Sequence, residues 1–255
     1  MINAICVIRN LQIKNKKEGE FVEYNKDKIN LISKLGHIGI IGVLITIISD
    51  FILLGKPGSA YEFLMAGTES MWDISTIRIT VGTFIGVVVL PLQALGVVPV
   101  YFALKPSAKL IRLITVIPYA HAILMGVGFH TAYAFIGSGW KLNHRPEASL
   151  ITSGLMEQYH TYWMILVVIM TVEIVVSSVI YTVIVGKGKT LFPRWMAIFS
   201  PVSVVAFTLP LVFLLPYPVG GYLGPACLNI STLLFFILTQ RMISKRMKEA
   251  KITNE

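Results

Sequence analysis

Six long apolar stretches constrain this chain more than any other feature of its sequence. Each has about 18 or more consecutive, mostly apolar residues, which is the length a helix needs to cross the hydrocarbon core of a bilayer. The sequence therefore predicts an all-α, polytopic membrane bundle of six transmembrane helices. The predicted spans are Leu35–Leu54, Ile77–Leu104, Leu110–Ile136, Tyr159–Val185, Met196–Leu215 and Tyr222–Thr239.

The composition agrees with a membrane protein and argues against other classes. Hydrophobic residues make up 55% of the chain and charged residues only 14%, far from the average soluble domain. The net charge is +9, but the basic residues follow the predicted loops and form no clustered patch, so we expect no nucleic-acid partner. Cys6 and Cys227 lie far apart, so neither a disulfide framework nor a thiolate metal site is indicated.

The distribution of basic residues predicts the orientation of the helices. Of the 22 Lys and Arg residues, only Lys56, Arg78, Lys141 and Arg145 lie on one side of the predicted membrane, and the rest lie on the other. Cytoplasmic loops carry the excess of Lys and Arg, so both termini are predicted to be cytoplasmic and the protein to be a multi-pass protein of the cell membrane. The predicted domains are a basic N-terminal arm (1–33), the six-helix transmembrane domain (34–240) and a basic tail (241–255).

Four ionisable side chains are predicted to share one layer of the membrane. Counting about 1.5 Å per residue from the predicted helix ends, Asp50, His130, Glu157 and His160 all fall in the outer leaflet. Glu157 and His160 are three residues apart, which places them on one helix face. Because an ionisable group in lipid needs a partner or water, we expect an outward-facing polar pocket at this level.

Two interpretations of this layer stay open. In the first, Asp50, His130, Glu157 and His160 hold a divalent metal such as zinc, which activates a water molecule, and the protein is a metal-dependent hydrolase of a lipid-like substrate. In the second, the carboxylates mark the water boundary and the histidines form hydrogen bonds between helices.

A second set of polar residues is predicted deeper in the membrane. By the same rise per residue, Glu173 and His37 lie about 20 Å inward of His160 and Asp50, and His121 lies about 13 Å inward of His130. Helical angle turns His121 and Glu173 away from the outer layer. Intramembrane ionisable residues mark ion and substrate pathways, so a transporter of a small solute or ion is an alternative function. A non-catalytic sensor or accessory protein is a third, and the expected partners are the bilayer and a lipid-like or small-molecule ligand.

Four sequence segments carry a resemblance to a known family. "ISDFILLGKPG", "GVGFH", "LFPRWMAIFSP" and "GPACLNISTLLFF" resemble an uncharacterised family of bacterial multi-pass membrane proteins, a domain of unknown function. That family carries an acidic residue after a glycine at the end of the first helix and a histidine in the third. These match Asp50 and His130, although Ser49 replaces the glycine. The resemblance implies no activity.

The predicted orientation can be tested by thiol labelling of single-cysteine variants in intact cells, with Cys6 and Cys227 replaced by serine. Cysteines on the outside should react with an impermeant reagent, and those inside only after the membrane is permeabilised. The outside positions are Gly67 and Asn143, and the inside positions are Gly19, Ser107, Gly188 and Lys251. Labelling of Gly188 from outside would overturn the predicted topology.

Overall fold

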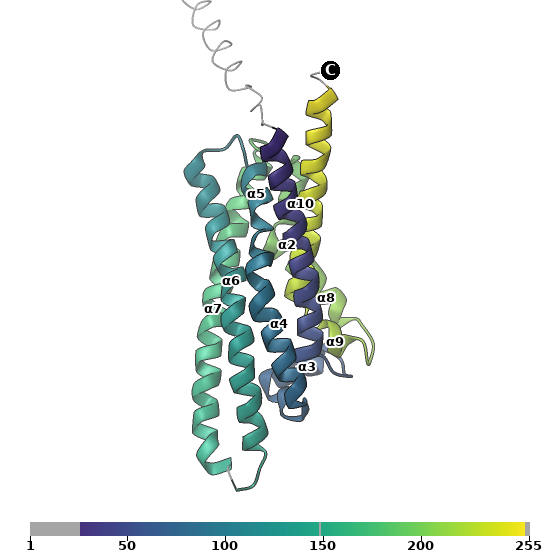
Figure 1. Ribbon diagram of the computed structural model, residues 1–255. Helices are drawn as coiled ribbons and strands as arrows, with labels where there is room; N and C mark the ends of the chain where they lie inside the picture. The colour runs from purple at the N-terminus through teal and green to yellow at the C-terminus, as the bar shows by residue number, and fades with distance from the viewer. Residues whose placement is uncertain (1–25, 148, 253–255) are drawn as a thin grey trace, which may run out of the picture. The chain divides into compact units, whose positions relative to one another are not determined.

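The computed structural model describes residues 26–147 and 149–252, and within them the protein is helical without a β-strand. The chain divides into two compact units, residues 1–31 and 32–255, and most of the predicted N-terminal arm lies outside the described residues. Figure 1 shows the helices of the second unit. The helices are α2 (Lys26–Leu53), α3 (Ala60–Ala66), α4 (Thr76–Ala94), α5 (Val97–Ala103), α6 (Lys109–Asn143), α7 (Ser149–Gly186), α8 (Pro201–Phe213), α9 (Gly220–Leu223) and α10 (Cys227–Ile252), with 3₁₀-helices η1 (Gly67–Asp73) and η2 (Arg194–Phe199).

Five helical segments of the described chain are long and apolar enough to cross a membrane. They correspond to α2, to α4 with α5, to α6, to α7 and to α10. The second is interrupted at Leu95 and Gly96, where a Cβ on Gly96 would overlap the ring of Phe236 from α10. Glycine is therefore needed for this close approach, and the predicted single helix is divided into α4 and α5.

The fifth predicted span differs from the structure. Met196–Leu215 was predicted as one helix, but η2 ends at Phe199 and α8 begins only at Pro201. The Ser200 hydroxyl accepts a hydrogen bond from the amide of Ser203, and Pro201 occupies the first helical position, as in many helix starts. At about 1.5 Å per residue, the 13 residues of α8 cover less than the hydrocarbon thickness, so a sixth crossing by this helix alone is not confirmed.

The fourth predicted span also has different bounds. It was predicted to begin at Tyr159, but α7 begins at Ser149 and pairs with α6, which continues to Asn143. In Figure 1 these two helices run side by side, and at the end where they are connected they extend beyond their neighbours. With 35 residues in α6 and 38 in α7, each is longer than the roughly 20 residues that cross a bilayer.

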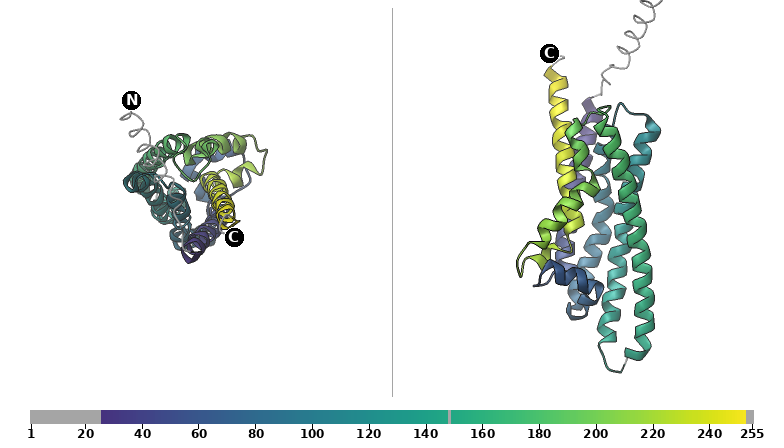
Figure 2. Two further views of the ribbon diagram at one scale, coloured as in Figure 1. Left: turned by 90° about the horizontal axis from the view of Figure 1, so that it is seen from above. Right: turned by 180° about the vertical axis from the view of Figure 1, so that it is seen from behind.

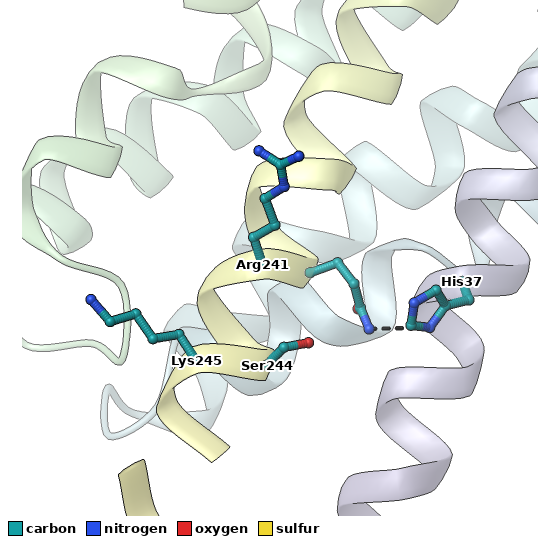
Figure 3. Close-up of a pocket in the computed structure, with 5 residues that line it drawn as sticks. His37, Arg241, Ser244 and Lys245 are labelled. Atoms are coloured by element: carbon teal, nitrogen blue, oxygen red, sulfur yellow. Dashed lines mark hydrogen bonds between the residues drawn. The ribbon is translucent and has the colours of Figure 1, made fainter. Parts of the chain in front are cut away.

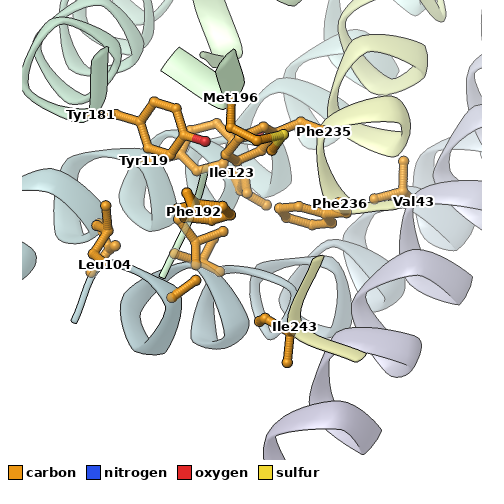
Figure 4. Close-up of a cluster of buried hydrophobic side chains, with 14 of the residues drawn as sticks. Val43, Leu104, Tyr119, Ile123, Tyr181, Phe192, Met196, Phe235, Phe236 and Ile243 are labelled. Atoms are coloured by element: carbon orange, nitrogen blue, oxygen red, sulfur yellow. The ribbon is translucent and has the colours of Figure 1, made fainter. Parts of the chain in front are cut away.

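Aromatic and branched side chains form the main packed cluster near the α5 end of the bundle (Figure 4). Tyr181 of α7 is almost fully buried, with its ring 5.4 Å from that of Phe192 and 5.5 Å from that of Phe235 of α10. Phe235 and Phe236 in turn contact Tyr119 of α6 edge to face. Because lipid is as apolar as these side chains, this cluster stabilises the bundle by close packing rather than by removal from water.

Small residues bring α2 and α4 into backbone contact. A Cβ added to Gly42 of α2 would lie 2.7 Å from the backbone nitrogen of Gln93, and one added to Gly82 of α4 would lie 2.6 Å from the Cβ of Leu53. The hydroxyl of Ser49 donates a 2.5 Å hydrogen bond to the carbonyl of Gly82. Such close approach through glycine is typical of membrane helix pairs, and it holds the end of α2 that carries Asp50 against α4.

The short elements gather at the end of the bundle where α2 stops, as Figure 2 shows from behind. The amide of Gly221 in α9 donates to the carbonyl of Gly58, which precedes α3. Trp140 of α6 donates from its ring nitrogen to Thr68 of η1, and Lys56 pairs with Asp73 at 3.2 Å. These contacts place α3, η1 and α9 together across that end of the bundle.

Candidate functional site

Asp50 and His130 form a buried pair between α2 and α6. Asp50 lies three residues before the end of α2, and only 6% of the residue is exposed. His130 of α6 is 5% exposed, and its Nε2 lies 3.5 Å from Oδ1 of Asp50. Both residues belong to the predicted outer polar layer, and the structure brings these two of its four members together.

Two amide side chains extend the pair to four helices. Asn229 of α10 donates from Nδ2 to Oδ2 of Asp50 at 2.7 Å. Its own oxygen accepts a 3.0 Å hydrogen bond from Nε2 of Gln93 in α4. Asp50, His130, Asn229 and Gln93, here called the Asp50 cluster, therefore link α2, α6, α10 and α4 through one connected set of polar contacts.

A glycine in α4 makes room for the imidazole of the Asp50 cluster. A Cβ built on Gly86 would overlap the ring of His130. Tyr133, one turn further along α6, meets the His130 ring edge to face with 6.4 Å between ring centres. The imidazole is thus fixed between α4 and its own helix, with one nitrogen directed at Asp50.

Glu157 and His160 lie apart from the Asp50 cluster on an exposed face of α7. His160 stacks on Trp163, whose ring lies 6.4 Å from that of Tyr133, so only aromatic rings connect it to the buried histidine. Among the residues that the structure describes, no three His, Cys, Asp or Glu side chains converge on a common point that could hold a metal ion. The depth count that grouped all four took Tyr159 as the start of this helix, whereas α7 begins at Ser149.

The deeper polar residues His121 and Glu173 meet each other. Nδ1 of His121 on α6 lies 2.6 Å from Oε1 of Glu173 on α7, and the two side chains are 57% and 21% exposed. The helical angles of these residues were compared only with those of the outer layer, so their pairing was not predicted. Antiparallel packing of α6 on α7 brings them to the same level.

His37 lines a cavity of about 370 Å³ between α2 and α10, shown in Figure 3. Its Nδ1 lies 2.8 Å from the carbonyl of Ser33 and 3.3 Å from Nε2 of Gln240. Arg241, Ser244 and Lys245 form the rest of the lining, and Figure 3 shows the two cationic side chains pointing apart. This cavity is at the opposite end of α2 from Asp50.

Arg78 is a functional candidate that sequence reasoning missed. Its guanidinium donates hydrogen bonds to the carbonyls of Phe51 and Ile52 at 3.1 and 2.9 Å, and to the carbonyl of Gly55. The last turn of α2 contains no basic residue of its own, so Arg78 satisfies its free carbonyls and balances the negative end of the helix dipole. The sequence feature that points to Arg78 is a basic residue in the first turn of the next helix, α4.

Neither Gln93 nor Asn229 was among the predicted site residues. Amide side chains inside apolar spans are the signal that points to them, because such groups need partners in lipid. Their partners come from helices distant in sequence, and hydropathy contains no information on which pairs meet.

The sequence of the chain matches one known protein family. The sequence matches a family of unknown function, DUF6796, over residues 24–246. The chain belongs to that family. The match covers every helix from α2 to α9 and most of α10, so the whole Asp50 cluster lies within the family region. No curated protein and no solved structure matches the chain.

We predict that Asn229→Ala destabilises the protein by about 1–3 kcal/mol, because it leaves a buried carboxylate oxygen and the Gln93 amide without their partner. Unfolding of the purified protein in detergent measures the effect. Thr80→Ala is the control, since this exposed hydroxyl bonds only to the carbonyl of Thr76 in its own helix and its loss should change stability little. Equal effects of the two substitutions would show that the Asp50 cluster does not stabilise the bundle.

Proposed function

We propose that this protein transports a small solute or ion across the membrane and that the Asp50 cluster binds the coupling proton. One observation carries the proposal: a carboxylate inside an apolar bundle is contacted by an imidazole from α6 and by an amide from α10. Intramembrane carboxylate and histidine groups that face one another are the elements of proton relays in membrane proteins.

The chemistry of the pair supports proton binding. A carboxylate only accepts hydrogen bonds, whereas its protonated form also donates one, and imidazole can do either. At 3.5 Å between Nε2 and Oδ1, a small movement brings His130 and Asp50 into proton-transfer contact. Binding of a proton would change which atoms donate the hydrogen bonds between α2, α6 and α10. Protonation is therefore coupled to the arrangement of these helices.

The amide network offers a further polar contact. Oε1 of Gln93 is buried and has no hydrogen-bond partner among the described residues, although Nε2 of the same side chain is bonded to Asn229. A buried acceptor without a donor is costly. In the proposed transport cycle this oxygen receives a donor when the helices move or when a solute enters.

The geometry favours transport over the hydrolase hypothesis. A hydrolase needs a cavity beside its reacting groups, and two cavities of the described structure are lined by other residues. One is the cavity at His37, and the other, of about 30 Å³, is lined by residues such as Tyr119, Ser231 and Thr232. Among the described residues, no group of three His, Cys, Asp or Glu side chains could hold a metal ion for hydrolysis.

The proposed orientation keeps both termini on the cytoplasmic side of the cell membrane, on the basis of the basic loops. It requires six crossings, and we propose that η2 and α8 together provide the fifth. Helices shorter than the hydrocarbon thickness are accommodated by local thinning of the bilayer or by neighbouring protein. In this orientation the Asp50 cluster lies toward the outer surface, and His37 toward the cytoplasm.

We predict that the full-length protein in liposomes couples solute movement to a change in luminal pH. An encapsulated pH dye reports the change when solutes from a panel of monovalent cations, amino acids and sugars are added outside. At least one solute should give a response that is lost in Asp50→Asn, because an amide does not bind the coupling proton. Glu157→Gln removes an exposed carboxylate from α7 and should retain the response.

Two outcomes of this assay would contradict the proposal. The first is a wild-type protein that gives no luminal pH response to any solute in the panel. The second is a response in Asp50→Asn equal to that of the wild type and of Glu157→Gln, which would leave Asp50 with a purely structural role.

A further inference from the structure

The cavity beside His37, here called the His37 cavity, lies where two membrane helices leave the apolar region. On α2 the last cation before the apolar stretch is Lys34, one turn before His37. On α10 the apolar run ends at Thr239, and the cations Arg241 and Lys245 follow. Because basic residues that flank a membrane span lie at the level of the lipid headgroups, the His37 cavity lies at that level.

Contacts between α2 and α10 build the base of the His37 cavity. Nε2 of Gln240 donates hydrogen bonds to the hydroxyl of Ser33 at 2.8 Å and to its carbonyl at 3.2 Å. A Cβ on Gly36 would overlap the oxygen of the same amide, so glycine lets Gln240 lie against α2. Gln240 is only 6% exposed. The base of the cavity is therefore fixed by helix packing.

His37 is oriented by the same part of α2. Its Nδ1 lies 2.8 Å from the carbonyl of Ser33, and since a carbonyl only accepts hydrogen bonds, Nδ1 is the donor. Nε2 of His37 makes no hydrogen bond within the described residues, and it also donates when the imidazole is protonated. In Figure 3 the hydroxyl of Ser244 points toward His37. The cavity thus offers a hydroxyl and an imidazole nitrogen to a ligand.

The charges around the His37 cavity are of one sign. Arg241 and Lys245 are four residues apart on α10 and both line the cavity, a spacing at which like charges destabilise a helix. The described lining contains no Asp or Glu, and neither cation has an ion pair within the described chain. Their charged ends point apart in Figure 3, and both long side chains are exposed and can turn toward an anion.

We propose that the His37 cavity binds a phosphate group, and that its level in the membrane makes the headgroup of an anionic phospholipid the source of that group. Guanidinium and ammonium groups are the usual protein partners of phosphate. The volume of about 370 Å³ lies within the range of small-molecule sites. Basic pockets between membrane helices on the cytoplasmic side bind such headgroups. This binding does not depend on transport.

A headgroup in the His37 cavity would hold α2 to α10. The same two helices are joined farther along by the hydrogen bond from Asn229 to Asp50, and at the cavity by the bonds from Gln240 to Ser33. A ligand that binds only the folded bundle stabilises it. Anionic phospholipid should therefore raise the unfolding temperature of the protein by an amount that depends on the two cations.

Lipid binding to the full-length protein in neutral detergent tests the site. The protein is titrated with phosphatidylglycerol or with zwitterionic phosphatidylcholine, and bound lipids are counted by native mass spectrometry. We expect phosphatidylglycerol to bind more tightly, and the double variant Arg241→Gln, Lys245→Gln to bind it about tenfold or more weakly. Both positions are exposed, and glutamine keeps the helix propensity, so the double variant should fold.

The matched control is Lys187→Gln with Lys189→Gln. It removes two exposed cations from a loop that is predicted to lie on the same side of the membrane, outside the cavity. Its affinity for phosphatidylglycerol should change by less than about twofold. An equal loss in the control and in the α10 double variant would overturn the proposal, because it would show general attraction to basic residues. Equal binding by the wild type and the α10 double variant would also overturn it.

Soluble glycerol phosphate distinguishes the two sources of phosphate, with binding measured by titration calorimetry. Weaker binding of glycerol phosphate than of phosphatidylglycerol supports a lipid headgroup as the ligand. Equal or tighter binding that is lost in the α10 double variant supports the same phosphate site with a soluble ester as its ligand. Binding of neither compound to the wild type would overturn the proposal.

Discussion

The buried carboxylate of Asp50 needs hydrogen-bond partners, and the helices around it supply them. In an apolar environment an isolated charge is strongly unfavourable, and a polar group without a partner loses several kcal/mol. Three neighbouring helices each supply a polar side chain. Asn229 of α10 and His130 of α6 contact Asp50, and Gln93 of α4 bonds to Asn229. Since lipid provides no competing hydrogen bonds, these contacts select one arrangement of the four helices among many that would bury similar apolar surface.

The backbone geometry supports the same cluster. Gly42 and Gly82 let α2 and α4 approach closely, and Gly86 leaves the space that His130 fills. Arg78 bonds to the carbonyls at the end of α2, one turn beyond Asp50. A substitution at any of these positions is therefore expected to act on the Asp50 cluster, although none of the four residues belongs to it. Close packing at these glycines holds the Asp50–His130 pair in a fixed geometry.

Much of the helical architecture follows from hydropathy, because a spanning helix needs an apolar stretch of fixed minimum length. The same signal contains no information on where a helix ends in water. For this reason α7 was predicted to begin at Tyr159 rather than Ser149, and the depth of Glu157 and His160 was counted from a position ten residues after the start of the helix. The break before Pro201 was visible as a Ser-Pro pair, a signal of a helix start, but the apolar run across it concealed the break.

The sequence did not predict which residues of different helices contact one another. His121 and Glu173 are 52 residues apart, and their contact depends on which faces of α6 and α7 meet, a property of the packed structure rather than of either helix. Asn229 was not among the predicted site residues, because its partners Asp50 and Gln93 lie 179 and 136 residues away. Depth along the membrane could be estimated from one sequence, but direction around each helix axis could not.

Infrared difference spectroscopy of the protein in lipid tests the central claim most directly, namely that the Asp50 cluster is an intramembrane proton site. Acidification of the wild type should produce a protonated-carboxyl band in the buried region of the spectrum. That band should be missing in Asp50→Asn, and it should shift in Asn229→Ala because the hydrogen bond to Oδ2 is lost. Identical difference spectra from the wild type and Asp50→Asn would contradict the account and would leave Asp50 as a residue that only holds helices together.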